Sequence, residues 1–171
     1  MALPKKLKHM NLFNDGNSYL GVAQSVTLPV LSRKLEAWRG AGMEGPIKVD
    51  LGHSDDGLQL EWTLGGWDLL AVRQFAAIQV DAVQLRFAGS VQRDDTGAVS
   101  AVEIVARGRH EEIDFGDAQP GEDTEHKITT ALSYYKLSVD GQVLIEIDLL
   151  NFVYIVDGND RLAEHRKAIG L

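Results

Sequence analysis

The chain contains no cysteine. This absence excludes thiolate nucleophiles, cysteine-ligated zinc, iron–sulfur clusters and structural disulfides together. It fits a protein that folds in a reducing compartment, although proteins without cysteine also work elsewhere. Because a chain of 171 residues buries about 70% of its unfolded surface, the core needs neither a disulfide nor a metal ion to hold it together.

Long apolar runs are also absent. No stretch approaches the roughly 20 residues that a membrane-spanning helix needs. The basic cluster Lys5, Lys6 and Lys8 is not followed by the apolar region of a signal peptide. We therefore expect no membrane segment, and we expect the chain to stay in the compartment where it is made.

Basic residues are outnumbered. The chain has 17 Lys and Arg against 25 Asp and Glu, which gives a formal net charge of −8. This balance disfavours wrapping around DNA through phosphate neutralisation. It does not exclude DNA that passes close by without being held.

Short alternating segments dominate what is present. Hydrophobic residues make up 44% of the chain and charged residues 25%, a composition that predicts one globular domain over residues 1–171. Alternation of apolar and polar residues, typical of half-buried strands, recurs in five segments: 58–64, 83–92, 102–107, 128–139 and 143–147. We predict a mainly β (β-rich α+β) fold.

The alternation changes phase within the segment 128–139. Ile128, Leu132 and Tyr134 share one parity, whereas Tyr135 and Leu137 hold the other. Such a slip predicts a bulge, or a strand that passes from one sheet to another.

Two helices and one long loop complete the expected elements. An apolar stripe predicts a helix at about 67–78 that packs on a sheet, with the stripe formed by Trp67, Leu70, Ala71, Phe75 and Ile78. A turn at 157–160 precedes a short C-terminal helix at about 161–168. Glycine and proline punctuate residues 39–57, which we interpret as a long loop with one short strand at 47–51. Loops of this length are usually functional or mobile.

The search for metal and acid–base chemistry finds no convincing site. The five histidines (His9, His53, His110, His126 and His165) lie in different elements, and none forms the i, i+4 pair that binds zinc on a helix, so we interpret them as surface residues. Segment 110–112 (His-Glu-Glu) reads as a solvated strand end, because neighbouring strand residues point to opposite faces. The aspartate pairs at 55–56 and 94–95 fit turns rather than calcium loops.

Nucleotide chemistry is equally unsupported. The glycines between Gly40 and Gly45 are followed by Pro46 and an extended segment instead of a helix N-terminus, so they do not form a phosphate loop. Aromatic residues could stack on single-stranded nucleic acid, but no basic groove accompanies them, and core or subunit-contact roles fit better for Trp38, Trp62, Trp67, Tyr134 and Tyr135. We expect no catalytic, cofactor or metal site, and we do not expect an enzyme.

Several segments, taken in order, resemble a known family. These segments are Met1-Ala2-Leu3-Pro4, Leu12 to Gly16, Ser25 to Pro29, Arg39 to Met43, Val49 to Gly52, Arg86 to Ser90, Gly121-Glu122-Asp123 and Ile169-Gly170-Leu171. Together they resemble the major tail tube protein of contractile-tailed bacteriophages, and the tube protein of R-type pyocins is similar. No single segment is specific, but their order extends over essentially the whole chain.

The resemblance implies a fold, an assembly and a set of partners. The implied fold is two antiparallel sheets packed as a barrel-like sandwich, with one flanking helix. Six copies would form a ring, and rings would stack into the inner tube of a contractile tail through which DNA passes without specific binding. The implied partners are further copies of the chain and the tail sheath, baseplate and tail-terminator proteins. The implied location is the virion tail, assembled in the cytoplasm of the host bacterium.

Two groups of residues become candidate contacts under this hypothesis. We expect the loop at 39–57 to reach a neighbouring subunit or ring through Arg39, Gly40, Gly42, Met43 and Pro46. We expect the polar faces of the long hairpins to line the lumen, with Gln84, Arg86, Glu103 and Arg107 as candidates. An acidic lumen would repel DNA phosphates, so that the genome slides through.

Two alternatives remain open. The chain could be the tube protein of a headless contractile particle or of a contractile secretion system, which would share the assembly but not the destination. It could also be a monomeric β-barrel binding module. That alternative predicts a concave pocket with convergent polar groups of perturbed pKa.

Overall fold

Strands dominate the computed structural model, which describes residues 1–171. The elements in chain order are β1 (Lys6–Asn14), β2 (Asn17–Ser18), β3 (Ala23–Thr27), β4 (Arg33–Trp38), β5 (Ile47–His53), β6 (Leu58–Leu64), α1 (Leu69–Gln74), β7 (Val83–Gln92), β8 (Val99–Asp114), β9 (His126–Val139), β10 (Gln142–Asp148), β11 (Val153–Val156), β12 (Asn159–Asp160) and α2 (Ala163–Ala168). The predicted mainly β class, with antiparallel sheets and two short helices, is confirmed.

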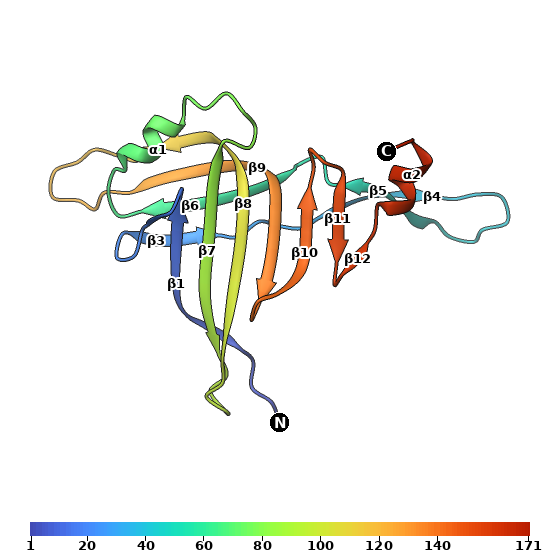
Figure 1. The fold of residues 1–171 in the computed structure, drawn as a ribbon, viewed down its shortest axis with the longest axis horizontal. Coiled ribbons are helices and arrows are strands. Elements are labelled where there is room, and N and C mark those ends of the chain that lie inside the picture. Colours follow the sequence, from blue (N-terminus) through green and yellow to red (C-terminus); the bar gives the residue numbers. More distant parts are fainter.

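One sheet of ten strands forms the body. Its main path runs β12-β11-β10-β9-β8-β7-β1-β2, and β6 and β3 branch from β9. Figure 1 shows the main-path strands side by side, with β3 and β6 crossing behind them. The remaining sheet contains only β4 and β5. The layers therefore arise largely from one sheet that folds over itself, and the strands do not close into a barrel.

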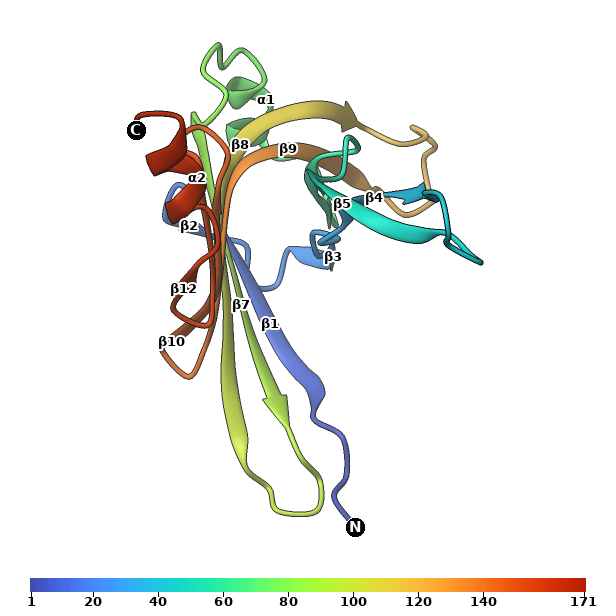
Figure 2. The same ribbon diagram turned by 90° about the vertical axis from the view of Figure 1, so that its right-hand side faces the viewer.

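A bend in β8 and β9 folds the sheet over. The first half of β9 pairs with β6 and the second half with β10. Between them, Arg107 pairs with Tyr134 and Gly108 with Leu132, so Ser133 is an extra residue on β9. This bulge produces the phase change predicted from the sequence. Figure 2 shows both strands curving over the lower layer.

Glycine is required at the bend because two backbones approach closely there. A Cβ added to Gly108 would lie 1.9 Å from the carbonyl oxygen of Ala131 on β9. Gly89 is less constrained, because a Cβ there would lie 2.9 Å from Cδ1 of Leu7, the end of a flexible side chain, and not against backbone.

The core fills the space inside the fold. Its largest fully buried side chains come from β1, β6, β7, β9 and β10, among them Leu12, Trp62, Leu64, Leu85 and Ile128. On β6, the expected alternation holds without exception, because Leu58, Leu60, Trp62 and Leu64 are all buried. The amphipathic period of this strand therefore defines one wall of the core.

The predicted helix at 67–78 is wrong in extent and in packing. α1 spans only Leu69–Gln74, because Asp68 has extended backbone and its carboxylate caps the helix by accepting the N–H of Ala71. Within α1 only Ala71 is buried. Trp67 and Ile78, expected to face a sheet, are 63% and 89% exposed.

The C-terminal helix is confirmed with a later start. It was predicted at 161–168 and spans Ala163–Ala168. The carboxylate of Asp160 accepts the N–H of Leu162, which closes a turn before the first helical residue.

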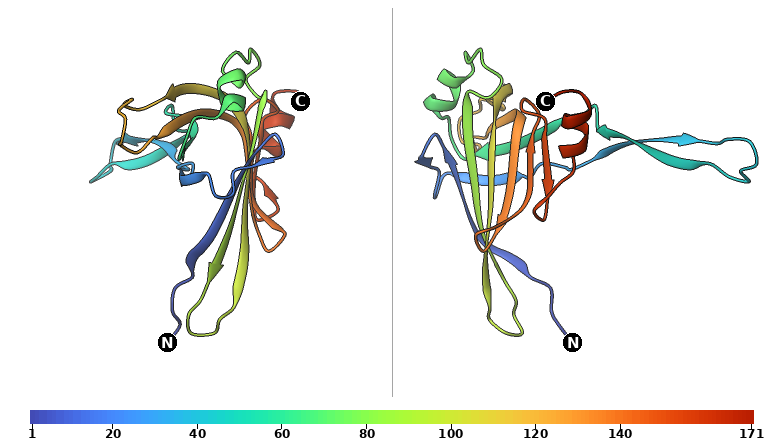
Figure 3. Two further views of the ribbon diagram at one scale, coloured as in Figure 1. Left: turned by 90° about the vertical axis from the view of Figure 1, so that its left-hand side faces the viewer. Right: turned by 45° about the vertical axis from the view of Figure 1, so that its right-hand side comes forward.

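The expected loop at 39–57 is largely a hairpin. β5 extends the predicted strand by two residues to His53, and it pairs with β4, so only residues 39–46 and 54–57 of the predicted loop are irregular. Figure 3 shows this hairpin, which we call the arm, projecting far from the body. No helix of the chain is long and apolar enough to span a membrane.

Candidate functional site

The four candidate lumen residues share one face of the main sheet. Gln84 pairs with Arg107, and Glu103 pairs with Ala88, two positions along β7 from Arg86. Cross-strand partners lie on the same face, so these side chains are neighbours. An N–H of the Arg86 guanidinium donates to Glu103 across 3.1 Å, and the guanidinium also lies 4.1 Å from the ring centre of Phe13. The sequence thus identified a real polar face.

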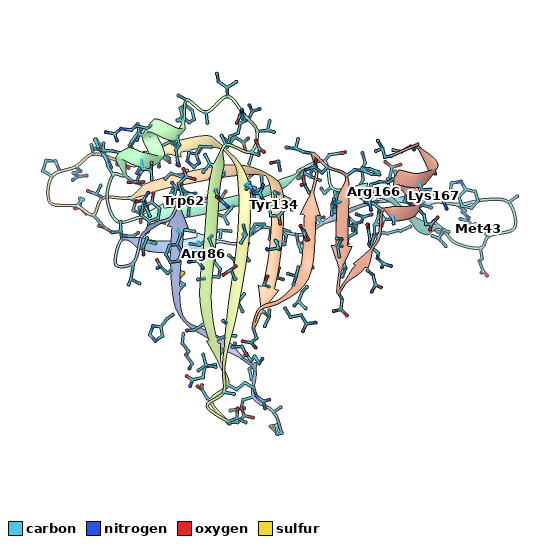
Figure 4. All side chains as sticks on the ribbon, viewed as in Figure 1. Met43, Trp62, Arg86, Tyr134, Arg166 and Lys167 are labelled. Atoms are coloured by element: carbon cyan, nitrogen blue, oxygen red, sulfur yellow. The ribbon has the colours of Figure 1, made fainter.

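This face continues over β9 and β10 and is electrically balanced. The guanidinium of Arg107 lies 4.4 Å from the ring centre of Tyr134, whose hydroxyl donates to Glu146. Burial, together with the nearby Glu146 carboxylate, raises the pKa of Tyr134. Between the bend and the hairpin tip, the face carries three basic and three acidic side chains: Arg86, Arg107, Lys136, Glu103, Glu146 and Asp148. Figure 4 shows Arg86 and Tyr134 on this part of the sheet.

The main sheet ends in two edges that the chain leaves largely unpaired. On one side β2 pairs only with Phe13 and Asn14, so the rest of β1 has no outer partner. On the other side β12 pairs only with Ile155 and Val156 of β11. Such edges present backbone donors and acceptors that another chain can pair with.

The arm presents apolar side chains without a covering layer. Trp38, Ile47 and Leu51 are each more than half exposed. Its base is held to the body, where Tyr154 of β11 contacts the ring of His53 at 4.8 Å and lies beneath the guanidinium of Arg33. An isolated two-stranded hairpin is marginally stable in water, and the arm has no second layer of its own to cover these side chains.

The five expected contact residues of the arm lie at its tip. The side chain of Arg39 donates to the carbonyl oxygens of Met43 and Glu44, which closes the turn. Gly42 has φ of 82°, a conformation that favours glycine. Figure 4 shows Met43 at the far end of the arm. These residues form the turn between β4 and β5, and a strand rather than a helix follows the glycines.

Sequence reasoning missed a buried polar network beneath α1. His110 and His126, expected on the surface, are 6% and 0% exposed. His110 bonds the hydroxyl of Thr130 through Nδ1 and the side-chain oxygen of Gln74 through Nε2, and the indole N–H of Trp62 donates to the same hydroxyl. The signal was available, because His110 has the inward parity of Ile104 and Ala106 on β8.

Burial in this network shifts several pKa values. Desolvation lowers the pKa of His110 to about 4 and also lowers that of His126. Burial and the bond to Asp68 raise the pKa of Tyr19. His110 and His126 lie inside the core and do not converge on an open pocket. No three His, Cys, Asp or Glu residues lie close enough together to hold a metal ion.

Comparison with known proteins decides the family. The profile of the phage tail tube protein FII family matches residues 4–170. The chain belongs to this family. It is 57% identical to the tail tube protein of Escherichia phage P2 over 172 aligned residues, with both chains covered completely. It is 42% identical to the major tail tube protein of Serratia phage KSP20, covering 94% of this chain and 92% of that one.

A shorter match points to a bacteriocin. Over 21 residues, or 12% of this chain, the sequence is 76% identical to the 23 kDa subunit of bacteriocin serracin-P from Serratia plymuthica. The resemblance stated from the sequence is confirmed by the family match. This phage tail tube protein is a structural component of the virion, and its relatives carry structural rather than enzymatic names.

Proposed function

We propose that six copies of the chain form a ring and that stacked rings form the inner tube of a contractile tail, the conduit for genome ejection. The observation that carries this proposal is the open main sheet with an unpaired edge at each side. Joining the β1 edge of one copy to the β11–β12 edge of the next satisfies backbone groups that a monomer leaves exposed. The sixfold number follows from the family resemblance alone.

The polar face of the sheet is the proposed lumen wall. Its three basic and three acidic side chains give it no excess of cations with which to hold DNA phosphates. DNA therefore transits without specific binding. From the sequence we expected an acidic lumen that repels DNA phosphates. The proposed wall instead carries no net charge, and we attribute the free passage of DNA to this neutrality.

The arm is the proposed contact with a neighbouring subunit or ring. Its exposed apolar strands and its ordered tip at residues 39–46 both require burial elsewhere. Sheath, baseplate and tail-terminator proteins are the further partners of the assembled tube, which forms in the cytoplasm of the host.

A second candidate function is the tube of a headless contractile particle. The short match to the serracin-P subunit favours it, and the same ring and tube would serve both. The two functions differ in whether a DNA-filled head is attached.

Lys8 offers a test of the edge-pairing proposal. It is the extra residue at a bulge of β1, since Leu7 and His9 have partners on β7 and Lys8 has none. We expect Lys8→Pro to fold but to block pairing at the β1 edge, because proline lacks an N–H donor. Lys8→Ala removes the same salt bridge to Asp94 but keeps the N–H donor, so its tube yield should clearly exceed that of Lys8→Pro. Tubes of Lys8→Pro at native yield in negative-stain microscopy would refute the edge-pairing model.

A further inference from the structure

The net charge of the molecule is concentrated in one segment. Residues 111–125 contain seven acidic and no basic side chains, which leaves 18 acidic against 17 basic residues in the rest of the chain. All seven are exposed, and none takes part in a salt bridge. We call this segment, from the end of β8 to the start of β9, the acidic segment.

An apolar groove lies within the acidic segment. It has a volume of about 450 Å³, and its walls are Trp67, Phe115 and residues 117–120 with Thr124. The rings of Trp67 and Phe115 meet edge to face at 5.3 Å, and both are substantially exposed. A groove with aromatic walls and a carboxylate rim fits a partner that is both apolar and basic.

A buried donor without a partner lies directly behind the groove. The ring of His126 stacks on Phe115 with 4.9 Å between ring centres. Its Nδ1 accepts the N–H of Asp68, so the proton is on Nε2, which is buried and bonds to nothing in the chain. Native proteins leave few such groups unsatisfied, so this atom sets the wall of the groove apart from the rest of the core.

The complementary surface is at the opposite end of the same molecule. Residues 1–8 lie along the hairpin tip at 93–98, where Lys8 pairs with Asp94 and the N–H of Leu3 donates to Asp95. We call these two segments the basic tip, because they contain Lys5, Lys6, Lys8 and Arg93 against two aspartates. Leu3 and Leu7 on the tip are about half exposed.

We propose that the groove of one copy receives the basic tip of a second copy. Figures 1 and 2 show the tip and the acidic segment at opposite ends of the fold, so a copy does not fill its own groove. A contact between two different surfaces repeats from copy to copy along one direction, as stacking of rings requires. The inference rests on the proposed tube, and it assigns the contact that joins one ring to the next.

Charge reversal tests the complementarity. We expect Lys5→Glu with Lys6→Glu to weaken tube formation by the purified full chain about tenfold at low salt, because attractive charge pairs become repulsive ones. Glu122→Lys with Asp123→Lys should have the same effect. Combining all four substitutions should restore tubes. As a matched control, Arg161→Glu with Lys167→Glu makes the same change of net charge on α2, and tubes should persist. Failure of the combined variant, or equal loss in the control, overturns the proposal.

Disulfide formation between introduced cysteines tests the geometry of the proposed contact. The native chain has no cysteine, so every disulfide must join introduced residues. In polymerised protein carrying Ala2→Cys and Ala118→Cys, mild oxidation should give a ladder of linked chains that reduction collapses. The pair Ala2→Cys and Lys167→Cys should give none. Tubes without a ladder, or a link to a chain of different mass in whole tail particles, refute this contact and leave the tube function intact. Absence of tubes from the unmodified chain refutes the proposed function itself.

Discussion

His110 links four elements through hydrogen bonds that require its neutral form. The side-chain oxygen of Gln74 accepts from Nε2, so Nδ1 accepts the hydroxyl proton of Thr130. That hydroxyl oxygen is then free to accept the indole N–H of Trp62. Every polar atom in this series of hydrogen bonds has a partner, and a buried polar network is stabilising when all of its members are paired.

The buried position of His110 predicts a pH-dependent stability. Its pKa is about 4 in the folded protein, below the ordinary value of 6.5, so the unfolded chain binds more protons between these values. The contribution of neutral His110 to the free energy of unfolding is complete above pH 6.5 and is lost as the pH falls towards 4. The loss amounts to about 3 kcal/mol in the free energy of unfolding. Urea denaturation of dilute subunits from pH 7.5 to 4.5 measures it.

Two variants distinguish the titration of His110 from other effects of low pH on the free energy of unfolding. His110→Gln cannot titrate, so its stability should fall about 3 kcal/mol less over the same pH range, from a lower value at neutral pH. His165→Gln, at an exposed position on α2, should keep the native profile. Identical pH profiles for His110→Gln and the native chain would show that His110 does not contribute.

At the scale of elements, the bend of β8 and β9 decides the shape of the subunit. The bulge at Ser133 changes which face of β9 points inward, and this lets one strand serve both layers. Gly108 allows the two strands to approach at that point.

Substitution at the bend should be costly. Gly108→Ala places a methyl group against the carbonyl of Ala131, and we expect a loss of about 2–4 kcal/mol in the free energy of unfolding as the strands separate. Gly45→Ala is the matched control, because a Cβ there meets nothing within 4 Å. Thermal unfolding followed by circular dichroism measures both. A loss below about 1 kcal/mol for Gly108→Ala would show that the bend has room to adjust.

The arm should matter for assembly and not for folding. Replacing Arg39 to Pro46 by a two-residue Asn-Gly turn keeps β4 and β5 but removes the tip. We expect the free energy of unfolding to stay within about 0.5 kcal/mol of native, because the hydrogen bonds of the tip join residues of the tip itself. We expect no tubes by electron microscopy. Normal tubes from this variant would contradict the assigned role of the arm.

The sequence predicted elements better than it predicted their partners. Period-2 alternation located β6 and β7, and the phase slip located the bulge, because each of these signals is local. The extent of α1 was missed because the cap at Asp68 fixes its start and only Ala71 of the apolar stripe is buried. Pairing of β9 with both β6 and β10 joins segments far apart in sequence, and no local pattern encodes it.

Predictions about the candidate residues also succeeded where the signal is local and failed elsewhere. Gln84, Arg86, Glu103 and Arg107 were correctly grouped on one face, since strand parity and the hairpin register determine faces. His110 and His126 were misplaced because their polarity was weighed above their inward parity. Which face lines a lumen depends on other copies of the chain, so it stays a proposal.

At the scale of the whole molecule, the net charge of −8 can be assigned to one part of the chain. It does not lie on the proposed lumen wall, which is balanced between the bend and the hairpin tip, but almost entirely on residues 111–125. Unpaired edges, an uncovered arm and an acidic segment opposite a basic tip are the three features from which we propose that copies of the subunit join one another.

A three-dimensional reconstruction by electron microscopy of particles formed by the purified full-length chain tests the central claim most directly. The account predicts sixfold rings, stacked into tubes, in which the main sheets of adjacent copies join at their edges and Arg86, Glu103 and Arg107 face the lumen. A chain that remains monomeric at high concentration would contradict it. So would a tube with the opposite face of the sheet turned inward.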